Sequence, residues 1–254
     1  MNCIVLFTKA PFNGQVKTRL VQPGSLDASE AALLYRAFLS DVLETVGRYM
    51  RKRGVELVLS YTPHEGLAEI RRLIGRLSLP VKVSSFDLQE GSMFDQRISN
   101  AFSKAFLSGY EAAVVIGGDL PTISERHLDE AFRLLDKSSS HGGGVIVVGP
   151  GLDGGVYLIG LRGGTPFTFN GVFERTDGTD ISLSLLEKRA EDLSIHILKT
   201  SLHYDVDIPE DLEVLRRELA KDPDLAPHTR RVLSALGLMP ADGASPRRLG
   251  ERPV

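Results

Sequence analysis

The segment after the first apolar run combines cations with turn-forming residues. Its key members are Lys9, Pro11, Gly14, Lys17 and Arg19. Such a loop can wrap a diphosphate, because backbone N–H groups close on phosphate oxygens and arginine makes two parallel hydrogen bonds. It matches neither the Walker A pattern nor a GxGxxG turn. Composition alone leaves a second interpretation open, a solvated basic loop.

A second segment delivers an acid at the end of an apolar run. The residues AAVVIGGDLPTIS place Gly118 and Asp119 directly after the run, and Pro121 prevents the strand from continuing. The glycine permits close approach of a ligand, and a carboxylate at such a tip suits Mg²⁺ or Mn²⁺. Asp119 could instead cap the next helix, but Ser124 is better placed for that role.

A third segment, HYDVDIPEDLEVL, holds two acids just before a predicted helix. Alternation along an extended chain sends Asp205 and Asp207 to opposite faces, so only one can readily meet a metal held by Asp119. We assign that place to Asp207, although its position ahead of Pro209 also suits a helix cap. The choice between the two acids stays open at this point.

Two further residues carry weaker signals. Asp153 lies in a glycine-flanked turn, and a hairpin explains that turn without any function. Arg97 lies early in a predicted helix, where a cation opposes the helix dipole. That position hints at a phosphate or carboxylate partner for Arg97.

The elements that must position these residues alternate along the chain. Strand-length apolar runs occur at residues 3–8, 57–61, 81–86, 112–116, 145–148, 156–161 and 193–198. Amphipathic helical segments separate most of them, which predicts a mainly parallel sheet with helices on both faces. Runs 145–148 and 156–161 are too close for a crossover helix and predict a hairpin, so the sheet should be mixed. Ligands of such folds collect beyond the carboxyl ends of the strands.

Composition narrows the class of protein. The 254 residues are 42% hydrophobic and 25% charged, with a net charge of -3, which fits one α/β domain and no general attraction to nucleic acid or an anionic membrane. Cys3 is the single cysteine, so no intrachain disulfide can form. No run reaches the roughly 18 apolar residues of a membrane span, and we expect a cytoplasmic protein. Residues 1–220 should form the domain and residues 221–254 a C-terminal helix with a flexible tail.

Four segments in this order resemble one specific family. They are FTKAPFNGQVKTRL, VIGGDLPTI, VGPGLDGGVYLIGL and YDVDIPEDL. The chain resembles, over about residues 2–219, the bacterial glycosyltransferase-A-like proteins once catalogued as an uncharacterised domain, some of which are named arsenosugar-biosynthesis glycosyltransferases. The resemblance implies a nucleotide-diphospho-sugar transferase fold, a nucleotide-sugar donor and a hydroxyl acceptor.

The resemblance also implies roles for individual residues. Lys9, Gly14, Lys17 and Arg19 match the nucleotide loop, Asp119 the metal-binding acid and Asp207 the second acid. Asp153 falls in the family's DGGYYLIGL segment, which raises its interest as a base for the acceptor hydroxyl.

This chain departs from the family's pattern on the acceptor side. The usual QxGxDLGERM reads QEGSMFDQRI at residues 89–98, although Arg97 remains, and residues 169–180 lack the usual tryptophan. The usual GSDCP reads GGDLP, and Val156 replaces a tyrosine. These changes make the family's acceptor a poor guide to this chain's acceptor.

Three functions follow from the sequence. The leading hypothesis is metal-dependent glycosyl transfer from a nucleoside-diphosphate sugar. The second is nucleotidyl transfer with release of pyrophosphate, because guanylyl- and cytidylyltransferases also combine a basic first loop with a strand-end acid. The third is nucleotide binding without catalysis. The base, the sugar, the acceptor and the oligomeric state are not determined by the sequence.

Overall fold

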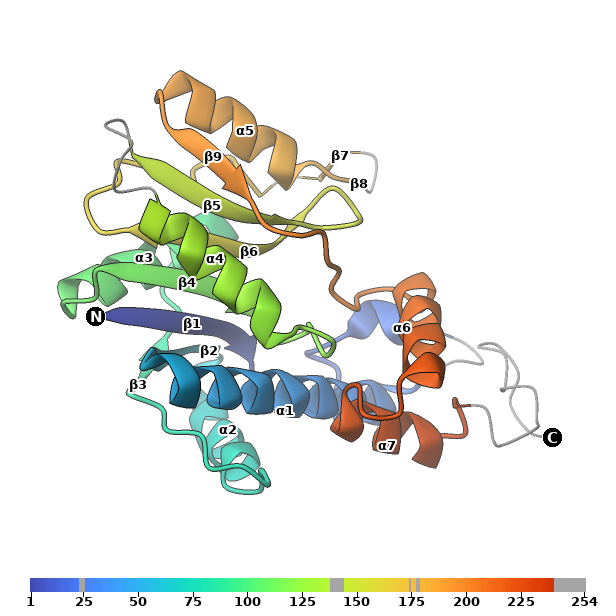
Figure 1. Ribbon diagram of the computed structural model, residues 1–254. Coiled ribbons are helices and arrows are strands. Elements are labelled where there is room, and N and C mark those ends of the chain that lie inside the picture. The colour runs from blue at the N-terminus through green and yellow to red at the C-terminus, as the bar shows by residue number, and fades with distance from the viewer. Residues whose placement is uncertain (23–25, 138–143, 174, 177–178, 240–254) are drawn as a thin grey trace.

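The computed structural model describes residues 1–22, 26–137, 144–173, 175–176 and 179–239. Its central sheet has seven strands in the order β3-β2-β1-β4-β6-β5-β9 (Figure 1). Their bounds are β1 Asn2–Lys9, β2 Glu56–Thr62, β3 Ser85–Leu88, β4 Ala112–Gly117, β5 Val145–Pro150, β6 Val156–Arg162 and β9 His196–Lys199. The mixed α/β class predicted from the sequence is confirmed.

The sheet is parallel except around β6, which runs antiparallel to both β4 and β5. The β5–β6 hairpin forms where the sequence predicted it. Two strands begin later than predicted. The residues ahead of β3 are not in a regular strand, and residues 193–195 still belong to the turn that ends α5, in which Ser194 has a positive φ of 53°. A second sheet, the short hairpin of β7 (Arg175–Thr176) and β8 (Thr179–Asp180), was not predicted.

Helices cover both faces of the large sheet (Figure 1). Helices α1 (Ala28–Arg53), α2 (Leu67–Ile74) and α4 (Glu125–Lys137) pack on one face, in a core shared with β1, β2 and β4. Helices α3 (Phe94–Leu107) and α5 (Ser182–Asp192) pack on the other face. Two short 3-10 turns, η1 (Thr18–Leu20) and η2 (His64–Gly66), complete this part of the chain. Both faces of the parallel strands are therefore buried, as continuous apolar strands require.

The first turn of α1 begins as its sequence predicts. The Asp27 carboxylate accepts hydrogen bonds from the backbone N–H of Ser29 and Glu30, and Glu30 accepts one from Asp27 N at 2.8 Å. This reciprocal arrangement satisfies donors that a helix start leaves without partners. It fixes the start of the long helix that lies beneath the basic first loop.

Helices α6 (Pro209–Lys221) and α7 (Pro227–Ala235) form a third core with the first turns of α1. Asp41 of α1 is buried and accepts hydrogen bonds from His228 N at 3.0 Å and Thr229 N at 2.9 Å. These bonds satisfy two donors at the start of α7. The C-terminal helix expected within residues 221–254 is thus packed onto α1, while the predicted tail, from residue 240, lies outside the described residues.

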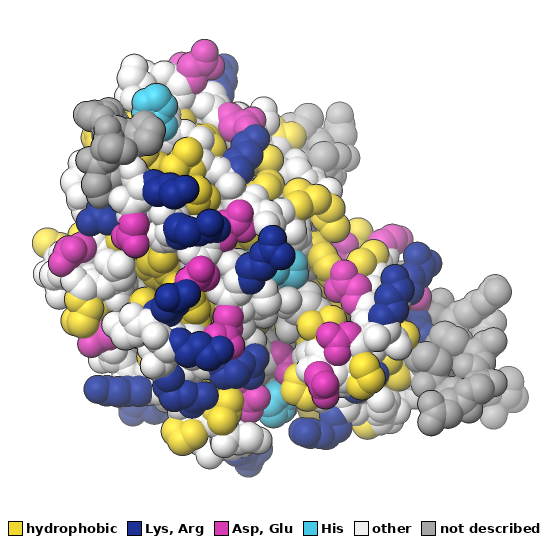
Figure 2. Space-filling model, in the orientation of Figure 1, with side chains coloured by type: hydrophobic (Ala, Val, Ile, Leu, Met, Phe, Trp, Pro, Cys, Tyr) yellow, Lys and Arg dark blue, Asp and Glu magenta, His cyan; other side chains and the backbone are white. Residues whose placement is uncertain are grey.

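Charges on one face of the molecule are interspersed. Figure 2 shows lysine and arginine side chains over α1 and α4 with acidic side chains between them. Lys52 pairs with Glu125 at 2.7 Å and Arg53 pairs with Asp129 at 2.6 Å. This face therefore presents paired charges and not a field of one sign.

None of the described helices has both the length and the apolar character needed to cross a bilayer.

Candidate active site

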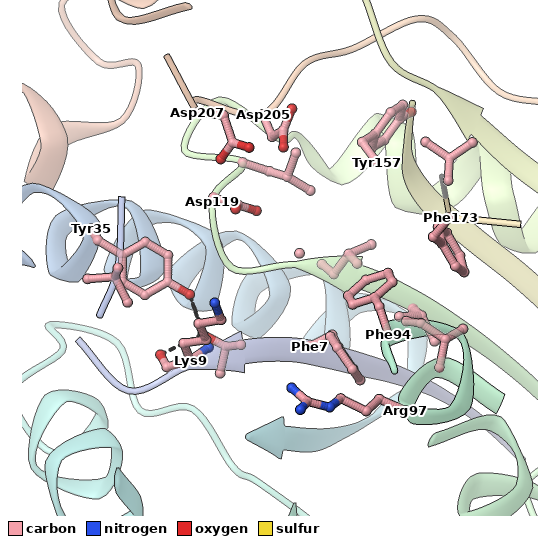
Figure 3. Close-up of a pocket in the computed structure, with 18 of the residues that line it drawn as sticks. Phe7, Lys9, Tyr35, Phe94, Arg97, Asp119, Tyr157, Phe173, Asp205 and Asp207 are labelled. Carbon is pink, nitrogen blue, oxygen red and sulfur yellow. Dashed lines mark hydrogen bonds between the residues drawn. The ribbon is translucent and has the colours of Figure 1, made fainter. Parts of the chain in front are cut away.

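A cavity of about 380 Å³ opens at the carboxyl ends of β1 and β4 (Figure 3). The first loop, the start of α3, strand β6 and the segment ahead of α6 complete its lining. This is the edge of the sheet at which the sequence predicted ligand binding.

The predicted site residues divide between this cavity and its surroundings. Its lining includes Lys9, Lys17, Arg19, Arg97, Asp119 and Asp207. Outside the lining lie Pro11, Gly14, Gly118 and Asp153. The structure therefore brings together the predicted cations and metal-binding acids, and leaves the predicted turn residues around them.

Lys17 is the centre of the charged part of the cavity. Its Nζ lies 2.7 Å from Asp119 Oδ2 and 2.6 Å from Asp207 Oδ1, and only 5% of its side chain is exposed. Burial disfavours its charge, but the two carboxylates outweigh burial and raise the pKa of Lys17 above its usual range. Lys17 therefore acts as a fixed cation between the two acids.

The backbone of the first loop carries Lys17 into this position at some conformational cost. Lys17 adopts the left-handed conformation, with φ 48° and ψ 37°, immediately before η1. Residues other than glycine reach this region with a penalty of about 1 kcal/mol, and such residues cluster at functional sites. Gly14, with φ 71°, provides the turn that precedes it.

Three acids lie close together in this part of the cavity. One carboxylate oxygen from each of Asp119, Asp205 and Asp207 lies within 4.8 Å of the others, and Figure 3 shows the two later acids beside Asp119. The expectation that alternation would separate Asp205 from Asp207 was wrong. Residues 204–207 are not part of a regular strand, so the two-residue alternation of side chains does not apply to them.

A second acid, Asp211, bonds to the backbone at the start of the next helix. Asp211 Oδ2 accepts hydrogen bonds from Asp207 N and Ile208 N, each at 2.9 Å. Asp207 itself pairs with Lys17 and, at 3.4 Å, with Arg19 Nη1. Its side chain therefore belongs to the cavity.

Asp205 has an unusual proton affinity for a carboxyl group. Burial, followed by the negative charges of Asp119 and Asp207, raises its pKa from 3.8 to about 7. The folded protein therefore holds this proton more tightly than the unfolded chain does. The resulting stability is complete below about pH 4 and is lost as the pH rises through about 7.

We therefore expect the melting temperature of the cation-free protein to fall between about pH 4.5 and 7.5 more steeply than that of Asp205→Asn, which cannot lose a proton. Thermal unfolding in chelator across this range measures the difference. An identical pH profile for the two proteins would show that Asp205 does not carry the proton.

Tyr35 supports the cavity from beneath the first loop. Its hydroxyl lies 2.7 Å from Thr8 Oγ1 and accepts a hydrogen bond from Lys9 N at 3.3 Å, and the Lys17 ammonium lies 5.9 Å from its ring centroid. A Cβ at Gly118 would come within 2.7 Å of Thr8 Oγ1 and 3.0 Å of the Tyr35 hydroxyl. Gly118 thus allows this packing. The sequence had suggested a different reason for a glycine here, the close approach of a ligand.

Asp153 and Arg97 differ in their relation to the cavity. Asp153 is exposed in the β5–β6 turn, where its Oδ1 accepts a hydrogen bond from Gly155 N at 2.9 Å. Its charge makes only a small contribution to the raised pKa of Asp205. Arg97 lines the cavity, and its Nε donates to Gly91 O at 2.9 Å, which aims the guanidinium from α3 toward β1 (Figure 3).

Several lining residues were missed by sequence reasoning. They are Phe7, Tyr35, Gln89, Phe94, Tyr157 and Phe173. Most are apolar or aromatic residues in helices or strands, where packing explains them equally well. The sequence offered one signal for them, the adjacent apolar residues Met93 and Phe94 at a predicted helix start.

A family model described as an uncharacterised protein conserved in bacteria, DUF2064, matches residues 45–176, which is more than half of the chain. A comparison with curated proteins found no match.

Solved structures show the same fold. A protein from Desulfovibrio desulfuricans G20, provisionally named a nucleotide-diphospho-sugar transferase, is 29% identical with a TM-score of 0.73, covering 92% of this chain and 96% of that chain. A cytidylyltransferase from Leptospira borgpetersenii is 12% identical with a TM-score of 0.52, covering 92% and 94% of the two chains. A CMP:2-keto-3-deoxy-manno-octonic acid synthetase in complex with CTP is 12% identical with a TM-score of 0.50, covering 87% and 99%.

The fold is thus that of the nucleotide-diphospho-sugar transferases, and the chain belongs to the bacterial DUF2064 family.

Proposed function

We propose that this protein is a glycosyltransferase that takes a nucleoside-diphosphate sugar as donor with the help of a divalent cation. The observation that carries the proposal is the juxtaposition of three carboxylates with a buried lysine in the lining of one cavity. A diphosphate needs cations beside its oxygens, and a divalent cation needs carboxylate ligands. This edge of the sheet offers both cationic side chains and carboxylates.

The three acids fit a divalent cation. Asp119, Asp205 and Asp207 offer oxygens within 4.8 Å of one another, and two of them already hold the Lys17 ammonium as a cation. Mg²⁺ and Mn²⁺ prefer such hard oxygen ligands and share them with phosphates. When bound, the cation would neutralise charge on the diphosphate.

The chain's own cations supply the remaining stabilisation. Lys17 is held at the acids, and Arg19 lies beside Asp207 with 48% of its side chain exposed. Departure of the sugar leaves growing negative charge on the diphosphate, and fixed cations stabilise that charge without rearrangement. Lys9 and Arg97 would bind the nucleotide from other parts of the lining, with Pro11, Gly14 and Gly118 shaping the backbone around it. Asp153, which is exposed in the β5–β6 turn outside the lining, is our proposed acceptor base.

Nucleotidyl transfer is the second candidate. The same cation-rich loop, with Lys9, Lys17 and Arg19, could hold the three phosphates of a nucleoside triphosphate. A protein that binds nucleotide without catalysis is the third, and the departures at residues 89–98 and 169–180 motivate it. Part of the second segment lies outside the described residues.

Ligand-dependent stabilisation tests these alternatives. We expect a nucleoside diphosphate and its sugar conjugate, each with Mn²⁺, to raise the melting temperature by about 5 to 10 °C at roughly one hundred times the dissociation constant. Chelator should remove most of this shift. Stronger stabilisation by a triphosphate would favour nucleotidyl transfer, and stabilisation without turnover on any donor would favour simple binding.

A further inference from the structure

One wall of the cavity is aromatic and not charged. Phe7 of β1, Phe94 at the start of α3 and Phe173 beyond β6 form a chain of edge-to-face rings, with centroids 5.6 Å and 4.8 Å apart. Ile98 and Val156 line the same cavity. Figure 3 shows Phe7, Phe94 and Phe173 away from Lys9 and Tyr35, with Arg97 beside Phe7, so the aromatic rings and the first loop occupy different parts of the cavity.

Internal packing explains part of this wall, because Phe7, Val156 and Phe173 also pack against the core between the sheet, α3 and α5. It does not explain Phe94, which lines the cavity and is 48% exposed. An exposed aromatic side chain in a cavity marks surface that a ligand covers more often than surface that faces water.

The aromatic wall is also held in place before any ligand binds. Asp95 Oδ2 accepts a hydrogen bond from Gly171 N at 2.6 Å, which joins the first turn of α3 to the segment that carries Phe173. Arg189 Nη2 donates to Asn170 O at 2.9 Å and ties that segment to α5. A wall fixed in this way binds without the cost of ordering mobile side chains.

The chemistry of the wall restricts its occupant. A sugar ring or a nucleobase carries hydrogen-bonding groups along its edge, and burial without partners would penalise each of them. Phe7, Phe94, Ile98, Val156 and Phe173 have no side-chain donor or acceptor. Two polar side chains of the lining, Gln89 and Arg97, come from the same part of the chain. The Gln89 amide already donates to Thr8 O at 3.1 Å and Ser60 O at 3.0 Å, and Arg97 Nε donates to Gly91 O at 2.9 Å.

We propose that the aromatic wall binds the apolar body of the acceptor, so that the acceptor is an aryl or alkyl alcohol and not a sugar. This inference rests on the proposed glycosyl transfer. The acceptor would place its hydroxyl toward the charged part of the cavity and its hydrocarbon against Phe7, Phe94 and Phe173.

The test uses 4-methylphenol, 4-ethylphenol and 4-propylphenol as probes. Their binding is followed by ligand-observed NMR with nucleoside diphosphate present and Mn²⁺ absent. Each added methylene should tighten binding by about fourfold, the value for burial of one methylene group. Phe94→Ser should weaken 4-propylphenol binding by about tenfold. Leu107→Ser is the matched control, because Leu107 lies at the other end of α3 and is 88% exposed.

Four outcomes would overturn the assignment of the wall. Three are no increase in affinity along the series, equal affinity in Phe94→Ser and the parent protein, and tighter binding of methyl glycosides than of alkylphenols. The fourth is displacement of 4-propylphenol by a nucleoside without phosphates, which would assign the wall to the base of the nucleotide. Nucleotide-dependent melting measured on the same samples keeps the two proposals separate. If that shift is absent while the alkylphenol series holds, the glycosyltransferase proposal fails and the apolar site remains.

Discussion

Replacing Asp119 with asparagine is expected to lower turnover of the nucleotide-sugar donor by at least about a thousandfold. Asparagine has nearly the same size, so the packing around Gly118 should survive, but one of three carboxylates and one of two Lys17 partners lose their charge. Removal of a single fixed group that stabilises transition-state charge costs roughly a hundred- to a thousandfold in other enzymes. Here the same change also weakens the cation site, so we expect the larger value.

The measurement is donor turnover with Mn²⁺, together with the melting temperature with nucleoside diphosphate in Mn²⁺ and in chelator. In Asp119→Asn the two melting temperatures should converge, because the cation no longer adds to nucleotide binding. Asp129→Asn is the matched control, since Asp129 is an acid on α4 that pairs with Arg53. Retained cation-dependent turnover in Asp119→Asn would remove Asp119 from the proposed site.

The position of Asp119 could be predicted from the sequence because local rules determine it. An apolar run that ends in two glycines, an acid and a proline must leave the sheet at that acid, whatever the rest of the chain does. The same holds for the β5–β6 hairpin, where the short connection excludes a crossover helix. These features depend on residues adjacent in the chain.

Asp205 and the aromatic wall could not be predicted in the same way. The geometry of Asp205 depends on whether residues 204–207 form a strand, and the bond from Val206 N to Asp119 O at 3.2 Å that holds them is a contact between distant segments. Phe7, Phe94 and Phe173 come from three separate elements and meet only in the folded protein. Their residue type is equally typical of a buried core, so only their exposure in the cavity distinguishes them.

Lys17 was predicted as a phosphate ligand, but its salt bridges to two metal-binding acids were not. Lys17 and Asp119 are 102 positions apart in the sequence. Neither hydrophobic periodicity nor motif spacing predicts that two such distant residues are in contact. The structure shows that one cation already occupies the position between Asp119 and Asp207 that a divalent cation would approach. The two cations should therefore compete.

Lys17→Met is expected to separate the effect of Lys17 on cation binding from its effect on nucleotide binding. Methionine keeps the apolar stem but removes the ammonium, which leaves Asp119 and Asp207 close together without their counter-charge. Loss of one partner of a fully buried pair costs about 3 to 5 kcal/mol. The two carboxylates are 28% and 32% exposed, so solvent screening reduces the expected loss of unfolding free energy to about 1 to 3 kcal/mol.

Mn²⁺ without nucleotide should raise the melting temperature of Lys17→Met more than that of the parent protein, because Asp119 and Asp207 no longer share their negative charge with an ammonium. Nucleoside diphosphate should bind about 10 to 100 times more weakly, as expected for loss of one charge-assisted hydrogen bond. Thermal unfolding and calorimetric titration measure the two effects. Lys52→Met, at an exposed lysine of α1 that pairs with Glu125, is the control and should change neither. Equal stabilisation of the parent protein and Lys17→Met by Mn²⁺ would show that Lys17 does not compete for the acids, and its position would then serve the phosphates alone.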